Sequence, residues 1–197
     1  YIGSNLWDLG FHDDAYAVLS PVRQRYANNA TYWQLMLELS KSRQTASQML
    51  VAAENLFRLV LDHLPNQINY ASLLISQRAQ LERAIGLTFD ALIKAPNSLP
   101  VQVNYAQALV ITGRADEAAQ ILSSIDASHF DTSQWQGFAF AWLTVHHQKK
   151  DAKKIHSIAK RVIPDLLLPG DRKYFEVIVR WARNHKDSVE PLIGING

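Results

Sequence analysis

The chain contains no cysteine, and only 8 glycines and 7 prolines occur among its 197 residues. Without cysteine it can form no disulfide framework, no thiol nucleophile and no thiolate metal site. So little glycine and proline argues against a disordered chain and against a turn-rich β protein. No apolar run approaches the roughly 20 residues that a membrane-spanning helix needs. These absences favour a helical protein.

The residues that are present can build a sizeable core, because 48% of them are hydrophobic. The net charge is only +2, and the length suits one or two ordinary domains or one array of repeats. Because the chain begins at Tyr1 rather than Met, we expect a processed protein or a piece of a longer one. The compartment stays open between cytoplasm and periplasm.

Alanine recurs along the chain at a nearly constant interval. The alanines at positions 84, 118 and 152 are 34 residues apart, and the one at 53 precedes them by 31. Each is followed by apolar residues with a helical period. In the segment 101–125, Gly113 separates two such periodic runs. Asp116 lies at the start of the second run, where the positive end of the helix dipole favours a carboxylate. This pattern predicts a stack of helical hairpins. The recurring alanines are Ala15, Ala53, Ala84, Ala118 and Ala152.

The segment 101–125 resembles a tetratricopeptide repeat, which has a small residue early on its second helix and a glycine-type turn before it. The resemblance extends over nearly the whole chain. It implies an all-α fold, a right-handed α-solenoid of about five hairpins plus a C-terminal capping helix. We expect a single domain at 1–187 and a tail at 188–197. The hairpins are expected at 1–28, 29–65, 66–97, 98–128 and 132–164, and the capping helix at 171–186, unless that helix opens a sixth repeat.

The second hairpin departs from the repeat, because Ala53 comes about one helical turn late. We therefore expect roughly four extra residues within 40–48.

The first helices of such a stack line its concave side, and this chain places mostly neutral amides there. An amide offers both a donor and an acceptor, which suits the backbone of an extended peptide. The alternative is a groove that is polar only because it is solvated. A carboxylate clamp is rejected, because no Lys or Arg accompanies Asn69 and Asn104 on neighbouring first helices. The expected groove residues are Gln34, Glu38, Asn69, Gln77, Asn104, Gln107 and Gln134.

The last part of the chain is basic, with 11 Lys and Arg against 4 acids in residues 148–186. Such a surface can contact nucleic acid or another polyanion, although a solvated convex face explains it equally simply. The clustered cations are Lys149, Lys150, Lys153, Lys154, Lys160 and Arg161.

The sequence offers no candidate for catalysis. It lacks a phosphate-binding glycine loop, a nucleophile elbow and the His-Glu-x-x-His pattern, and its acidic pairs open helices, where acids are favourable. We therefore expect a non-catalytic scaffold for a protein or peptide partner, with no cofactor and no metal. The alternative is a regulatory module whose basic C-terminal third contacts nucleic acid or another polyanion.

Overall fold

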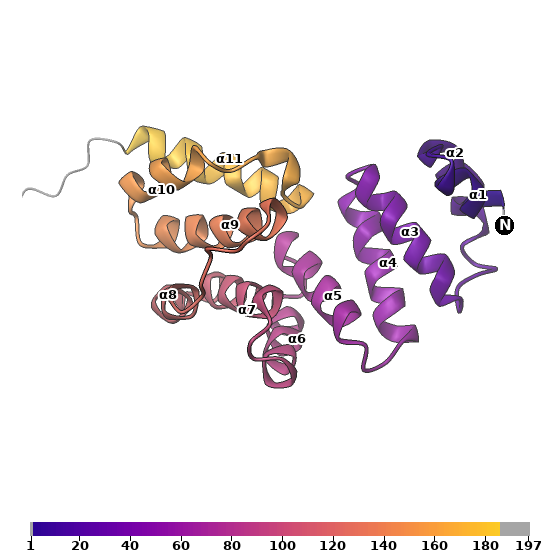
Figure 1. Ribbon diagram of the computed structural model, residues 1–197, viewed down its shortest axis with the longest axis horizontal. Coiled ribbons are helices and arrows are strands. Elements are labelled where there is room, and N and C mark those ends of the chain that lie inside the picture. Colours follow the sequence, from indigo (N-terminus) through magenta and orange to yellow (C-terminus); the bar gives the residue numbers. More distant parts are fainter. Residues whose placement is uncertain (1, 186–197) are drawn as a thin grey trace, which may run out of the picture.

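The computed structural model describes residues 2–185, and within them the chain forms only helices (Figure 1). The all-α prediction is confirmed for this part of the chain, while the expected tail at 188–197 lies outside it. Two short 3₁₀ helices, η1 (Ser20–Val22) and η2 (Pro164–Leu166), follow α2 and α10. The α-helices are α1 (Ile2–Asp8), α2 (His12–Leu19), α3 (Ala30–Ser42), α4 (Ala46–Leu59), α5 (Leu64–Ser76), α6 (Leu81–Lys94), α7 (Leu99–Ile111), α8 (Ala115–Ser123), α9 (Thr132–Gln148), α10 (Ala152–Ala159) and α11 (Pro169–Asn184).

The helices pack in the order in which they follow one another. Each odd-numbered helix from α1 to α9 pairs with the even-numbered helix after it, and the first helices α5, α7 and α9 also pack side by side (Figure 1). This sequential packing is consistent with helical repeats. Helix α11 packs against α9 and α10 and also reaches α5.

The repeat can be followed through one buried position, the fourth residue of each second helix. It is at most 1% exposed in all five hairpins. The recurring alanine of the sequence occupies this position in α2, α6 and α8, whereas a larger apolar residue does so in α4 and α10. The five residues are Ala15, Met49, Ala84, Ala118 and Ile155.

The expected insertion in the second hairpin is wrong. Helices α2, α4, α6 and α8 begin at residues 12, 46, 81 and 115, which are 34, 35 and 34 apart. The interval lengthens only before α10, which begins 37 residues after α8. There α9 has 17 residues, against 13 in each of α3, α5 and α7. The second hairpin therefore has the regular length and a different residue at its buried position.

Each hairpin turn has a left-handed residue two positions after the end of its first helix, and the turn between α5 and α6 has a second one at Gln80. In the turn after α7, the amides of Gly113 and Arg114 donate to the carbonyls of Val110 and Leu109, which closes the helix end. The other hairpins repeat this pair of hydrogen bonds, although only two of the five residues at the recurring position are glycine. These residues are Gly10, Gln44, Arg78, Gly113 and Lys150.

Two of the first helices, α3 and α9, begin at a side chain that caps them. Asn29 accepts a hydrogen bond of 2.8 Å from the amide of Tyr32 at the start of α3. Asp131 and Gln134 form a reciprocal capping box at the start of α9.

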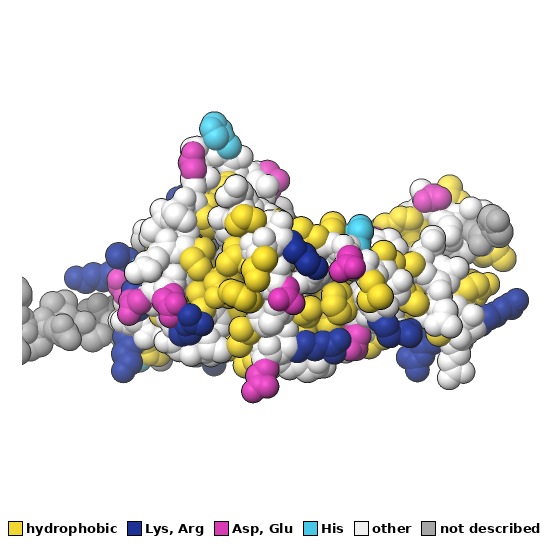
Figure 2. Space-filling model, turned by 90° about the horizontal axis from the view of Figure 1, so that it is seen from below, with side chains coloured by type: hydrophobic (Ala, Val, Ile, Leu, Met, Phe, Trp, Pro, Cys, Tyr) yellow, Lys and Arg dark blue, Asp and Glu magenta, His cyan; other side chains and the backbone are white. Residues whose placement is uncertain are grey.

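The buried apolar residues form three clusters along the stack, in α2–α7, in α7–α9 and in α9–α11. Apolar side chains also reach the surface, and Figure 2 shows them near the centre of the face that carries α6 and α8. Helix α6 exposes Phe89 and Ile93.

Candidate functional site: a pocket closed by α11

The beginning of α11 contacts the end of α5, which joins segments about 95 residues apart. The amide of Asp171 donates a hydrogen bond of 3.1 Å to the hydroxyl oxygen of Ser76. Gly170 lies directly against the backbone carbonyl of Ser76, so that a methyl group at Gly170 would overlap it. Only glycine fits at this point of contact.

This contact closes one side of a pocket of about 460 Å³. Its wall is built by the carboxyl-terminal ends of α5, α7 and α9, the turn between α5 and α6, and the first turns of α11. We call the side of the first helices that bears this pocket the inner face. The volume lies within the range of pockets that bind small ligands. The lining residues are Ile75, Arg78, Leu81, Gln107, Val110, Ile111, Phe140, Thr144, His147, Gln148, Asp171 and Tyr174.

The pocket holds one basic and one acidic side chain. The Arg78 guanidinium lies 3.7 Å from the centre of the Tyr174 ring and donates to the carbonyl of Ser76. Asp171 is only 7% exposed. Burial raises the pKa of Asp171 to about 7, although the positive charge of Arg78 and a hydrogen bond with Ser76 oppose the shift. No side chain among residues 2–185 forms an ion pair with Asp171.

A histidine adds a polar but uncharged group. Nδ1 of His147 lies 3.2 Å from the hydroxyl of Tyr174, and the ring meets Trp181 edge to face. Burial lowers the pKa of His147, so its ring is neutral at neutral pH. The pocket therefore combines apolar walls, neutral hydrogen-bonding groups and one pair of opposite charges.

The amide side chains expected in the groove lie in different environments. Gln107 is buried and lines the pocket. Asn104 donates to the carbonyl of Ile68, and Gln77 donates to the carbonyl of Ala46, so both side chains join neighbouring repeats.

The remaining groove candidates interact mainly within their own helices, apart from Asn69. Gln34 donates to Glu38, and Glu38 also pairs with Lys41. Gln134 belongs to the capping box of α9. Asn69 is half-buried on α5.

The basic residues are partly engaged with neighbours. Lys149 forms an ion pair of 2.6 Å with Asp116, and Lys154 lies 3.9 Å from the carboxylate of Asp151. The Arg161 guanidinium lies over the ring of Trp135. Lys150 occupies the left-handed position of its turn, and the side chains of Lys153 and Lys160 are exposed.

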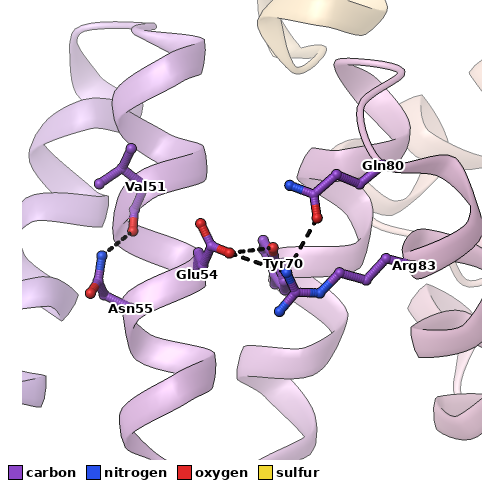
Figure 3. A network of polar contacts seen from close by, with 6 residues as sticks. All are labelled: Val51, Glu54, Asn55, Tyr70, Gln80 and Arg83. Atoms are coloured by element: carbon purple, nitrogen blue, oxygen red, sulfur yellow. Dashed lines mark hydrogen bonds and ion pairs between the residues drawn. The ribbon is translucent and has the colours of Figure 1, made fainter.

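A second polar cluster lies where α4, α5 and α6 meet (Figure 3). The hydroxyl of Tyr70 donates a hydrogen bond of 3.0 Å to Glu54, and Arg83 donates to the same oxygen at 3.2 Å. Burial, together with the Glu54 carboxylate, raises the pKa of Tyr70 to about 12. This cluster ties two hairpins together.

Sequence reasoning missed Arg78, His147, Asp171 and Tyr174. Arg78 lies in a turn and Asp171 in a later helix, and nothing in the repeat indicates that the two meet. One signal in the sequence was Gly170, which follows Pro169 in the first turn of the helix. A glycine there has no capping role, so it indicates a close contact with another segment. Within residues 2–185 no group of His, Asp and Glu side chains could hold a metal ion. No helix of the described part is long and apolar enough to cross a membrane.

Comparison with known proteins identifies one segment of the chain. Residues 77–139 match the model of the tetratricopeptide repeat family. This segment runs from the α5–α6 turn into α9. It includes the three residues of α7 that line the pocket, Gln107, Val110 and Ile111. Comparisons with curated proteins and with solved structures give no match. Tetratricopeptide repeats generally mediate protein–protein interaction and are typically non-catalytic. The chain is therefore a helical-repeat protein in which residues 77–139 match the tetratricopeptide repeat family.

Proposed function

We propose that this chain is a non-catalytic interaction scaffold that binds an extended partner segment along its inner face. In this proposal the hairpins form a right-handed α-solenoid, and α11 caps its C-terminal end. The observation that carries the proposal is the pocket, which opens between three successive first helices and contains Gln107. A binding site shared by several repeats is typical of helical arrays.

The amides support an extended partner rather than a folded one. Asn104 and Gln77 already bind backbone carbonyls of the preceding repeat, which demonstrates that side chains at these positions pair with main-chain groups. A peptide lying beside them would offer the same carbonyl and amide groups. Asn69 and Gln107, which lie on adjacent first helices, are the central contacts of the proposed groove.

The test is a selection from a library of unstructured peptides, followed by calorimetric titration of a selected peptide. We expect Asn69→Ala/Asn104→Ala/Gln107→Ala to weaken binding at least tenfold. The charge reversal Lys149→Glu/Lys153→Glu/Lys154→Glu, on α10 and the turn before it, should leave binding unchanged. Circular dichroism on both variants separates a binding defect from unfolding.

Salt provides the second arm of the test. Binding through the amides should change little between 50 and 500 mM salt, on the order of twofold. Loss of binding only in the charge-reversed variant, with a steep decrease in salt, would overturn the proposal and assign function to the basic surface instead.

A further inference from the structure

We propose that the pocket on the inner face receives a large apolar side chain of the partner segment, while the adjoining peptide group bridges Asp171 and Arg78. The peptide N–H donates to the carboxylate of Asp171, and the guanidinium of Arg78 donates to a peptide carbonyl. This inference rests on the proposed function and names the chemistry of its anchor residue.

The walls of the pocket select the side chain. Ile75 and Phe140 come from α5 and α9, Val110 and Ile111 from α7, and Leu81 from α6. A space of about 460 Å³ with such walls is large enough for a branched aliphatic or aromatic side chain. A short polar side chain would leave much of this apolar surface uncovered.

The charges select an uncharged but dipolar group. Asp171 is nine-tenths buried and has no ion-pair partner among residues 2–185, so its carboxylate, which has a hydrogen bond with Ser76, can accept further donors. Arg78 lies over the ring of Tyr174 and donates to the carbonyl of Ser76, and these two contacts hold its guanidinium beside the pocket. A ligand ammonium would satisfy Asp171 and be repelled by Arg78, and a ligand carboxylate would meet the reverse conflict. A peptide group has a donor at one end and an acceptor at the other, and it satisfies both residues.

The remaining polar groups agree with this choice. His147, Gln107 and Gln148 are neutral, so they add no net charge that would favour an ionic ligand. Burial raises the pKa of Asp171 to about 7, because it disfavours the charged carboxylate. A hydrogen-bond donor from the ligand would stabilise that charged form.

The test uses four small probes in titrations of the full chain at pH 8, followed by nuclear magnetic resonance. N-acetyl-leucinamide carries the apolar side chain and the peptide groups. N-acetyl-serinamide lacks the apolar side chain, isopentylammonium carries a cation, and 4-methylpentanoate carries an anion. We expect N-acetyl-leucinamide to bind at least fivefold more tightly than each of the others and to shift the amide signals of Val110 and Asp171. Equal or tighter binding of the serine probe or of either ion would overturn the inference.

A matched pair of variants places the binding site. Ile111→Trp fills the pocket from a half-buried position and should abolish the shifts caused by N-acetyl-leucinamide. Ile93→Trp makes the same change on α6, where the side chain is exposed, and should leave them unchanged. Unaltered binding to a folded Ile111→Trp variant contradicts the assignment.

The two proposals fail in different ways. If a selected peptide binds through the amides but the four probes bind equally or not at all, the interaction function stands and the anchor pocket is wrong. If the leucine probe binds as expected but no peptide is selected, the pocket is real and the extended groove is wrong.

Discussion

The amide of Asp171 donates a hydrogen bond of 3.1 Å to the hydroxyl oxygen of Ser76, and this bond joins the first turn of α11 to the last turn of α5. Most other contacts of the stack lie between helices that follow one another in the chain or between the first helices of successive hairpins. This one spans two complete hairpins, α7–α8 and α9–α10. It determines where the pocket ends and which side chains face it.

Gly170→Ala should break this contact, because the added methyl group would overlap the backbone carbonyl of Ser76, which cannot move aside as a flexible side chain can. We expect the free energy of unfolding to fall by about 1–3 kcal/mol. Gly86→Ala is the matched control on α6, where a methyl group would meet nothing within 4 Å. It should raise stability by about 0.5–1 kcal/mol. Urea denaturation measures both changes. If Gly170→Ala raised the stability as much as Gly86→Ala does, the added methyl group would not collide with Ser76.

The stability of the protein should depend on pH through Asp171. The folded state holds the proton of Asp171 up to about pH 7, whereas an unfolded aspartic acid releases it near pH 3.8. Between these values the folded state binds more protons, so the free energy of unfolding decreases as pH rises from about 4 to about 7. We expect a decrease of roughly a few kcal/mol from this residue, with no further change above pH 7.

Asp171→Asn isolates this contribution, because the amide keeps the shape and cannot ionise. The variant should have a higher melting temperature than the unmodified chain at pH 8 and no advantage at pH 4. The charged and titratable groups nearest to Asp171 in the pocket, Arg78, Tyr174 and His147, are unchanged in it. An identical pH profile in the two proteins would mean that Asp171 ionises normally.

Tyr70→Phe should destabilise the protein by about 1 kcal/mol, because it removes the hydrogen bond to Glu54 from a fully buried side chain. Tyr26→Phe, at a side chain that is 38% exposed, should change stability little. Spectrophotometric titration gives an independent readout. The difference between the unmodified chain and Tyr70→Phe should correspond to a phenol that ionises near pH 12 rather than near pH 10. A difference spectrum centred near pH 10 would show that burial and Glu54 do not raise the pKa of Tyr70.

Lys150→Gly should stabilise the protein by about 0.5–1 kcal/mol. Lys150 has a φ of 57°, in the left-handed region that glycine adopts with little cost and other residues adopt with strain. Lys153→Gly lies within α10 and should have the opposite sign, costing about 1 kcal/mol. The two variants remove the same charge, so their difference in thermal denaturation reports the backbone alone. A loss of stability in both would indicate that the lysine charge outweighs the turn geometry.

The hairpin framework could be predicted from the sequence because its signals are local. Ala118, Gly113 and the apolar period on either side of the turn lie within one segment of 25 residues. The register was harder where several alanines are close together. Helix α4 contains Ala52 and Ala53 beside Met49, and the alanine pattern favoured Ala53, whereas packing places Met49 at the buried position. A flexible methionine can fill a site that alanine fills elsewhere, so composition alone does not fix the register.

The pocket could not be predicted, because it depends on a contact between distant segments. The spacing of the repeat determines which helices are neighbours, but the position of α11 relative to α5 depends on the cumulative rotation of the hairpins between them. Arg78 occupies a turn position where other hairpins have glycine, glutamine or lysine. The sequence does not indicate that its guanidinium lies over the ring of Tyr174. The expected groove amides remain a prediction, although Gln107 lies in the pocket.

The contact between Ser76 and Asp171 also has a mechanical consequence. A stack of hairpins held only by neighbouring contacts behaves as a spring, which lengthens by small rotations at every interface. The hydrogen bond between α5 and α11 limits that extension, because the hairpins between these two helices cannot open while the bond is intact. A force that pulls the two ends of the chain apart should therefore meet one stiff step, at which α11 leaves α5, before the softer extension of the remaining hairpins begins.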